Sequence, residues 1–430
     1  MLYERWCEIA TGRRNEPAVR QTGAERCWTF AELQAAAERL PEEDEWMVHP
    51  RGTGVEFVLA VLAGWRRGKV VCPLEAGQVA PPVSRPPPGC VHLKLTSATT
   101  GAPRLVAFTE AQLAADAENI VATMGLRPDW PNLGCISMAH SYGFSNLVLP
   151  LLLHGIPLHV VPSPLPETVR RAAAGETALT LAAVPALWRA WHEADAIPPG
   201  VRLGISAGAP LPLELEQAVF KGSGLKIHNF LGATECGGIA YDDSESPRKE
   251  AACIGWPMVN VTLSADESGC LTVQGANVGE TYWPEPAVEL GGGRFQTSDL
   301  VDLRQGQVYW LGRASDLINV AGRKVSPATI EQALLRHPAV RECVVFGVPG
   351  AEAERGEIIV ACAVTPSRAN IADLRNFALE QLENWQVPRE WWLVDSLPVN
   401  ARGKISRAEW RQRYQRRHER GSRTESSSGG

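Results

Sequence analysis

The stretch CVHLKLTSATTGAPRLVAF, residues 90–108, is the most informative part of the chain. It starts as an apolar strand, passes through a loop of small and hydroxyl residues, and returns to an apolar strand. Small residues leave backbone N–H groups exposed in a concave turn, and Ser97, Thr99, Thr100 and Arg104 add further donors. This composition is typical of a phosphate-binding loop, although the Walker A pattern is absent. A solvated turn is the alternative that the loop alone leaves open.

The sequence after this loop alternates short apolar strands with helical segments. Such alternation predicts an α/β fold with stacked, mostly parallel sheets, whose ligands collect at the carboxyl ends of the strands. We expect strands within residues 90–95, 133–139, 178–184, 201–208 and 226–232, and helices over 110–124 and 185–194.

Two changes of character divide the chain. Five prolines between Pro81 and Pro88 favour extended backbone and predict a connector at which a new unit starts. After Gly312, a Ser-Pro helix start is followed by apolar strands and a second helix, which predicts a separate small α+β domain. We therefore expect a large N-terminal domain over residues 1–312, a small C-terminal domain over 316–412 and a disordered tail over 413–430.

Composition excludes several classes of protein. With 45% hydrophobic and 21% charged residues the chain can build folded cores, so disorder and fibre are excluded. A net charge of −6 argues against a nucleic-acid partner. The most apolar run, residues 147–161, is interrupted by two prolines and a histidine, so we expect no membrane span. The ten scattered cysteines, without a CxxC pair, predict a reducing cytoplasm and no structural zinc.

Further polar residues lie where a nucleotide could be held. Thr234 and Glu235 follow a predicted strand, so a hydroxyl could meet a phosphate oxygen and a carboxylate could help to hold Mg²⁺. Asp299 could accept hydrogen bonds from two ribose hydroxyls, and Arg313 and Lys404 supply cations further along the chain. Singly, each has a plain alternative: a solvated carboxylate, a turn residue, a surface ion pair or a surface cation.

In order and spacing, the segments LTSATTGAPR, LGATE, TSDL, GRASDLINVAGRKV and LPVNARGKISR resemble the motifs of the adenylate-forming superfamily. This superfamily comprises acyl- and aryl-CoA synthetases, adenylation domains of peptide synthetases, and luciferases. The resemblance covers nearly the whole chain and is closest to the acyl- or aryl-CoA ligases. It implies an AMP-forming acid–thiol ligase of fatty or aromatic acid metabolism.

The resemblance implies a chemistry and a set of residues for it. A substrate carboxylate attacks the α-phosphate of ATP, pyrophosphate leaves, and the acyl-adenylate passes its acyl group to the thiol of CoA or of a carrier protein's phosphopantetheine. The implied catalytic residues are Lys404, Glu235, Thr234 and His140, with Glu235 as the Mg²⁺ ligand. The residues implied to bind nucleotide or pantetheine are Ser97, Thr99, Thr100, Gly101, Arg104, Gly208, Leu231, Gly232, Asp299, Arg313 and Gly322. The small domain is expected to rotate about Ser315 after adenylation.

The sequence departs from the pattern of the superfamily at four positions. Ala98 and Ser298 stand where glycine is usual, Arg104 where lysine is common, and Leu231 where a tyrosine often stacks on adenine. None of these changes removes a reacting group, so we expect modest nucleotide affinity rather than an inactive protein. A nucleotide-binding pseudoenzyme is kept as an alternative.

The substrate acid and the acceptor are less well defined. His140 and Tyr142 resemble the residues that gate the substrate carboxylate. Ser141 stands where amino-acid-activating relatives have an aspartate, which favours an acid without an α-amino group. Phe144, Ser206, Ala207 and Gly208 are expected to shape the pocket, with aromatic and fatty acids both open. The arginines of residues 411–417 could meet CoA or an acyl carrier protein, or form a solvated helix end.

Overall fold

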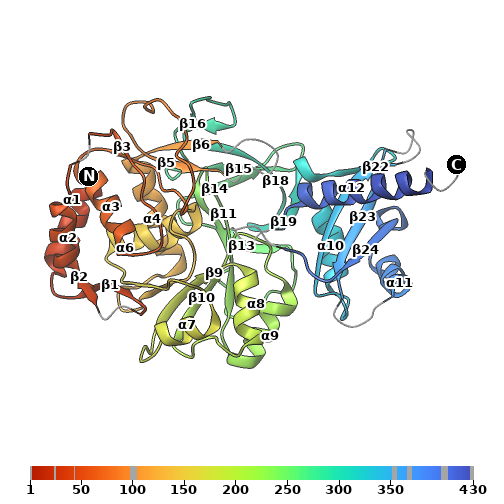
Figure 1. Cartoon of the computed structure of the whole chain (residues 1–430), viewed down its shortest axis with the longest axis horizontal. Coiled ribbons are helices and arrows are strands. Elements are labelled where there is room, and N and C mark those ends of the chain that lie inside the picture. Colours follow the sequence, from red (N-terminus) through yellow and green to blue (C-terminus); the bar gives the residue numbers. More distant parts are fainter. Residues whose placement is uncertain are drawn as a thin grey trace.

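The computed structural model describes residues 2–23, 26–42, 44–96, 104–350, 356–365, 370–398 and 405–426. Figure 1 shows a large N-terminal part built around extended sheets, beside a smaller C-terminal part that contains α10 to α12. The expected α/β architecture with a large and a small domain is confirmed.

The centre of the large domain is a block of parallel strands in the order β11-β10-β9-β7-β8-β1. Every residue of β9 is buried, as expected for a strand covered on both faces. Trp188 and Trp191 of α8 are fully buried and pack in the same core as β9. The bounds are β1 Pro17–Gln21, β7 Asn132–Gly134, β8 Leu158–Val160, β9 Leu179–Ala183, β10 Val201–Ser206, β11 Ile227–Ala233 and α8 Pro185–Glu193.

Beyond β11 the same 14-stranded sheet continues as antiparallel strands in the order β12-β13-β19-β18-β15-β14, which the alternating pattern did not predict. β2 pairs with β1 at the far edge, and β17 pairs with β18 off the main path. The bounds are β2 Cys27–Thr29, β12 Gly237–Tyr241, β13 Cys253–Pro257, β14 Thr262–Ala265, β15 Cys270–Gln274, β17 Leu290–Gly291, β18 Arg294–Arg304 and β19 Gln307–Arg313.

A second sheet, ordered β16-β6-β5-β4-β3, carries the candidate phosphate loop between its antiparallel strands β5 and β6. The proline-rich segment before β5 has neither helix nor strand, but β4 pairs with β5 across it, Val71 opposite His92. The prediction that a new unit starts there is therefore wrong, because both sides of the connector share one sheet. The bounds are β3 Met47–Val48, β4 Val70–Val71, β5 Cys90–Leu95, β6 Leu105–Thr109 and β16 Thr281–Trp283.

Helices of the large domain begin where the sequence supplies caps. Thr29 and Thr109 each form a capping box, with Glu32 and Gln112 respectively. The helix predicted over 110–124 is confirmed as α4. The bounds are α1 Leu2–Gly12, α2 Phe30–Arg39, α3 Val55–Arg66, α4 Glu110–Met124, α5 Ser141–Gly143, the π-helix η1 Phe144–Val148, α6 Leu149–His154, α7 Pro166–Ala172 and α9 Leu213–Ser223.

The small domain is a three-stranded sheet, β22-β23-β24, with a hydrophobic cluster on each face. One cluster contains residues of α10 and α11, and the other contains Trp410 and Tyr414 of α12. The bounds are η2 Ala314–Asp316, β20 Ile318–Val320, β21 Arg323–Val325, α10 Pro327–Leu335, β22 Glu342–Pro349, β23 Glu357–Val364, α11 Ile371–Gln381, η4 Asn384–Gln386, β24 Glu390–Val394 and α12 Arg407–Ser426.

The prediction of a disordered tail from residue 413 is wrong for the start of that segment. α12 continues through it, and Tyr414 is 7% exposed because it packs four residues after Trp410 on the same helix face. The polar composition of the segment concealed this apolar contact.

No helix in the described ranges is both long and apolar enough to cross a membrane.

Candidate functional site

Asp299 and Arg313 face each other across the β18–β19 hairpin, in which they are register partners. Arg313 Nε–H donates to Asp299 Oδ1 over 3.2 Å, and the indole N–H of Trp310 donates to the same oxygen over 2.9 Å. The Asp299 side chain is 10% exposed and that of Arg313 is 34% exposed. Both bonds end on Oδ1, so the carboxylate is oriented while its second oxygen faces neither donor.

Glu235 lies just beyond the end of β11 and is held by a tyrosine from β16. The Tyr282 hydroxyl donates to Glu235 Oε1 over 3.0 Å, and the Arg104 guanidinium lies over the Tyr282 ring, 3.4 Å from its centre. Burial raises the pKa of the Glu235 carboxyl, while the hydrogen bond from Tyr282 and the charge of Arg313 oppose the rise. The chain Arg104–Tyr282–Glu235 thus links the candidate phosphate loop to the candidate metal ligand.

The Asp299–Arg313 pair and Glu235 lie close enough to interact electrostatically. The charges of Arg313 and Asp299 both act on the pKa of Glu235, although β18 and β19 lie far from β11 in the sequence. Thr234 directly precedes Glu235, and Leu231 is half-buried on the same strand. A Cβ on Gly232 would lie 2.8 Å from the Gly237 carbonyl oxygen, so the β11–β12 turn requires glycine there.

The loop between β5 and β6 lies partly outside the described residues. Its neck is closed by two bonds, since the Thr96 N–H donates to the Arg104 carbonyl over 2.8 Å and the Arg104 N–H donates to Thr96 Oγ1 over 3.0 Å. The expected phosphate ligands Ser97, Thr99, Thr100 and Gly101 lie outside the described residues, and so does Lys404.

His140 ends the segment that leads into the short helix α5. Its Nε2 lies 3.0 Å from Glu75 Oε1, and the Ser137 hydroxyl donates to the same oxygen. Tyr142 follows on α5, and its hydroxyl lies 3.5 and 3.4 Å from the carbonyl oxygens of Ala183 and Ile205, at the carboxyl ends of β9 and β10. The segment from His140 into η1 is called the acid segment below. It meets the parallel strands at their carboxyl ends, the edge at which this type of fold binds ligands.

The carboxyl end of β10 lies next to the residues that Tyr142 contacts. Ser206 is fully buried, and its hydroxyl has no hydrogen-bond partner among the described residues. Gly208 has a φ of +86°, a conformation that glycine adopts without strain. Phe144 is buried in η1, with its ring centre 4.4 Å from that of His92.

Gly322 and Ser315 lie in the small domain and at its entry. Gly322 has a φ of +82° in the β20–β21 turn, and a Cβ there would meet nothing within 4 Å. Within the chain, the reason for glycine at this position is therefore its positive φ and not a lack of space. Ser315 lies in η2, where the next residue, Asp316, accepts from the Arg407 guanidinium over 3.0 Å. The expected pivot is thereby tied to α12.

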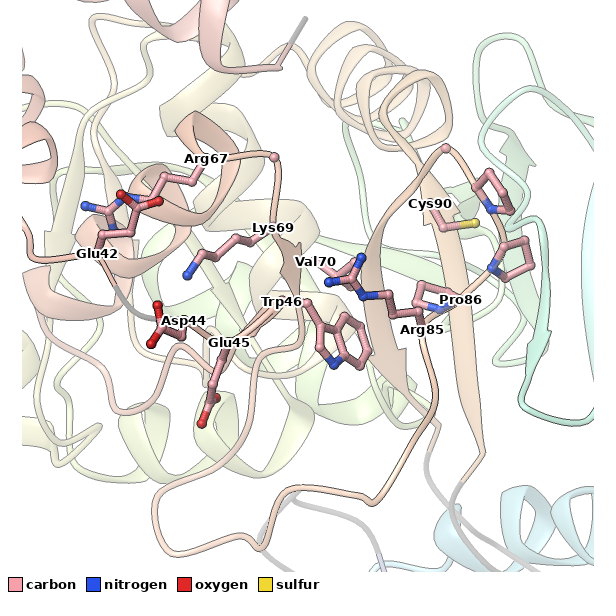
Figure 2. A pocket seen from close by; sticks show the side chains of 14 residues that line it. Glu42, Asp44, Glu45, Trp46, Arg67, Lys69, Val70, Arg85, Pro86 and Cys90 are labelled. Carbon is pink, nitrogen blue, oxygen red and sulfur yellow. The ribbon is translucent and has the colours of Figure 1, made fainter.

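A cavity of about 660 Å³ lies elsewhere in the large domain, and Figure 2 shows its lining of charged side chains around Trp46 and Arg85. Trp46, Val70 and Cys90 place it at the amino ends of the parallel strands β3, β4 and β5. The candidate phosphate loop follows the opposite end of β5. This cavity is therefore separate from the site described above.

Three residues of the site were not predicted from the sequence: Tyr282, Trp310 and Glu75. Each orients a predicted residue, namely Glu235, Asp299 or His140. Tyr282 and Glu75 lie dozens of residues or more from their partners, so no local pattern identified them. Trp310 had a usable signal, since a hairpin through residues 305 and 306 brings it back beside Asp299.

The Glu235 carboxylate fits the Mg²⁺ ion that the resemblance implies. A carboxylate oxygen is a preferred Mg²⁺ ligand, and Mg²⁺ is commonly held by one or two carboxylates together with substrate phosphates. No cluster of three or more His, Cys, Asp and Glu side chains capable of holding a metal was found among the described residues. A single carboxylate connected to the candidate phosphate loop fits an ion that arrives with the nucleotide.

Comparison with known proteins agrees with this geometry. Residues 77–288 match the family described as AMP-binding enzyme, and residues 329–404 match its C-terminal domain. A 2-succinylbenzoate–CoA ligase from Bacillus cytotoxicus is 30% identical over 338 residues, covering 74% of this chain and 69% of the relative. A sulfoacetate–CoA ligase from Cupriavidus necator is 29% identical over 350 residues, covering 76% and 68%.

The solved structure of ATP-bound MatB from Rhodopseudomonas palustris superposes with a TM-score of 0.83 at 22% identity, over 96% of this chain and 99% of that one. At this identity the likeness supports the fold, while the sequence matches establish the family. The chain belongs to the family of AMP-binding enzymes, with both the main domain and the C-terminal domain of that family present.

Proposed function

We propose that this chain activates a carboxylic acid without an α-amino group as an acyl-adenylate, with release of pyrophosphate, and then transfers the acyl group to CoA. The strongest support is one electrostatic observation. Glu235 follows β11, whereas Asp299 and Arg313 belong to the distant β18–β19 hairpin, and the charges of both act on the pKa of Glu235. Arg313 also donates a hydrogen bond to Asp299. Glu235 is connected through Tyr282 to Arg104, at the neck of a loop rich in hydroxyl and small residues. The relatives that match the sequence are named as CoA ligases.

The residues would divide the work by charge and position. Asp299, oriented by Trp310 and Arg313, would accept from the ribose hydroxyls. The loop hydroxyls and Arg104 would bind the phosphates, and Glu235 would help to hold Mg²⁺, which neutralises phosphate charge when it is bound. Lys404 would bridge the substrate carboxylate and the α-phosphate, so catalysis rests mainly on positioning and electrostatics.

The remaining assignments belong to the same proposal. Thr234 would contact phosphate, Leu231 and Gly232 would line the adenine site, and Gly208 would lie between nucleotide and acid. His140 would gate the acid, and Gly322 would approach the pantetheine. The two domains would meet near residues 313–315, and the ten free cysteines support a reducing, cytoplasmic location.

The test is ATP–pyrophosphate exchange over a panel of aromatic, fatty and sulfonated acids. Exchange with at least one acid is expected, and adding CoA should then yield a thioester detected by mass. If an acyl carrier protein is acylated in place of CoA, the acceptor assignment is wrong. If no acid supports exchange while ATP binds, the pseudoenzyme alternative replaces this proposal.

Lys404→Ala tests the role of the lysine separately. We expect adenylate formation to fall by about 10²- to 10³-fold, because a preorganised charge in the transition state is lost. Near-normal exchange by this variant would remove Lys404 from the mechanism without touching the rest of the proposal.

A further inference from the structure

A buried ion pair lies beneath the candidate site, between β5 and α4. Lys94 is 4% exposed and Asp116 is 1% exposed, and Lys94 Nζ lies 3.5 Å from Asp116 Oδ2. The Ser145 hydroxyl donates to Asp116 Oδ2 over 2.5 Å, and Lys94 Nζ donates to Ser145 Oγ over 3.2 Å. The three side chains form a closed triangle, referred to below as the Lys94 triad.

The Lys94 triad is costly to bury. Desolvation lowers the pKa of the Lys94 ammonium, and the Asp116 carboxylate only partly opposes this. Replacing such a pair by apolar residues of similar volume is often neutral or stabilising. Stability alone therefore does not explain these charges in the core.

The connections of the triad suggest an explanation. Lys94 lies on β5 two residues before Thr96, at the neck of the phosphate loop. Ser145 lies in the π-helix η1, which continues the acid segment from His140. π-Helical turns often mark functional sites. The triad thus joins the strand that leads to the nucleotide to the helix that leads to the acid.

Asp116 adds a third connection, to the Glu235 turn. Its Oδ1 accepts from the Gly238 N–H over 3.1 Å. Gly237 has a φ of +64°, and a Cβ there would overlap the Asp116 carboxylate. The residues just after Glu235 are therefore packed directly onto Asp116.

We propose that the Lys94 triad is a positioning device that holds the phosphate loop, the acid segment and the Glu235 turn in register for adenylate formation. Lys94, Asp116 and Ser145 are positioning residues, since they act through the groups that they hold. The inference rests on the proposed function for its kinetic readout, but it also predicts an effect on nucleotide binding alone.

The decisive variant is the double substitution Lys94→Met/Asp116→Asn, which removes both charges and keeps the volume. We expect a melting temperature within about 4 °C of the wild type, because no unpaired charge is left buried. Pyrophosphate-exchange kcat should fall about tenfold or more, because small misplacements of reacting groups are costly. The KM values for ATP and for the acid should both rise.

The matched control is Lys226→Met/Asp242→Asn. It removes another buried lysine and aspartate, whose Nζ and Oδ2 lie 2.5 Å apart, at the amino end of β11 and away from Glu235. Lys226 also pairs with Glu216, which keeps Arg248 as its partner in this variant. This control should leave kcat near the wild-type value for the protein that folds. An equal loss of kcat in the control would mean that any buried pair has this effect, and would overturn the assignment.

Ser145→Ala keeps the test valid if the double variant fails to fold. It breaks the link to η1 while the two charges stay paired, so kcat should fall by about 2- to 10-fold with little change in melting temperature. Wild-type kinetics in the folded double variant, or in Ser145→Ala where the double variant does not fold, would overturn the proposal.

If the wild-type protein shows no exchange activity, the proposed function is refuted, but the positioning role of the Lys94 triad can still be tested. In that case the affinity for Mg·ATP is measured by calorimetry, and the double variant should bind about fivefold more weakly than the wild type. An unchanged affinity, or a wild-type protein that does not bind Mg·ATP, would overturn the positioning role.

Discussion

Two charged clusters at opposite ends of β11 differ in how completely their charged groups are buried and paired. At the amino end, Glu216, Lys226, Asp242 and Arg248 form a quartet of which no member is more than 6% exposed. Lys226 Nζ lies 2.6 Å from Glu216 Oε1, and Arg248 Nε lies 2.8 Å from Glu216 Oε2. Backbone carbonyls accept most of the remaining donors of the two cations, including the carbonyl of Leu211 at 2.8 Å.

At the carboxyl end, Glu235, Asp299 and Arg313 are held less completely. Arg313 is one-third exposed, and Asp299 receives two donors on one oxygen only. A fully satisfied cluster has no donor or acceptor left for a ligand. A partly satisfied cluster retains donors and acceptors that a nucleotide can use.

The largest expected effect comes from breaking the quartet. Glu216→Gln leaves two buried cations with a single carboxylate, so we expect the free energy of unfolding to fall by about 3–5 kcal/mol. Urea unfolding measures this, with Glu250→Gln as the control, since the Arg304–Glu250 pair is exposed. A loss below about 1 kcal/mol would show that the quartet relaxes and is not the rigid cluster described.

The next largest effect is expected at the other end of the strand, on activity and not on stability. Asp299→Ala should reduce kcat/KM for ATP by about 10²-fold, because the oriented ribose acceptor is lost. Trp310→Phe removes only the orienting N–H and should cost about 2- to 10-fold. If Asp299→Ala instead unfolds the protein while kcat/KM of the folded fraction is normal, the two ends of β11 do not differ as argued.

A pH profile sharpens the comparison further. Burial raises the pKa of Glu235, and the carboxylate is the form that we propose holds Mg²⁺, so activity should rise with pH as this group ionises. Tyr282→Phe removes a hydrogen bond that stabilises the carboxylate, so the acid limb should move to higher pH, by about one unit. A limb that stays in place or moves to lower pH would contradict the role of Tyr282.

The smallest effect is expected between the domains. Arg341 donates to both carboxylate oxygens of Glu193 at the end of α8, over 2.7 and 2.6 Å, but both side chains are nearly half exposed. Glu193→Gln should change the free energy of unfolding by less than about 1 kcal/mol, and less still at high salt. Thermal unfolding of the variant at low and at high salt measures this change. A loss of more than about 1 kcal/mol at both salt concentrations would mean that this pair is coupled as strongly as the charges of the buried quartet.

The sequence predicted those parts of the site that local motifs encode. Glu235, Asp299 and Arg313 each lie in a recognisable segment, and the structure places them within electrostatic reach of one another. Their orienting partners could not be read in the same way. Tyr282 reaches Glu235 because β16 pairs with β6, which joins residues about 175 positions apart. Such contacts follow from sheet topology and not from any periodicity along the chain.

As for the site, those parts of the fold that have a local sequence pattern were predicted. Apolar runs indicated β9, β10 and β11, the helical pattern of residues 110–124 indicated α4, and a Ser-Pro helix start indicated α10. The antiparallel extension beyond β11 was not predicted, because strands such as β14 and β18 contain exposed residues and lack the long apolar runs of the parallel block. The tail prediction overlooked Tyr414, whose aromatic ring outweighs the polar residues around it.

The second cluster of the small domain affects how variants of this protein should be interpreted. Leu397 and Ile405 pack in this cluster with Trp392, Trp410 and Tyr414, and Ile405 is the residue directly after Lys404. Described residues on both sides of the segment that contains Lys404 therefore pack in one hydrophobic core. Trp410→Ala removes a large side chain from this core, so loss of turnover in such a variant does not by itself identify a residue that contacts the acid or the nucleotide.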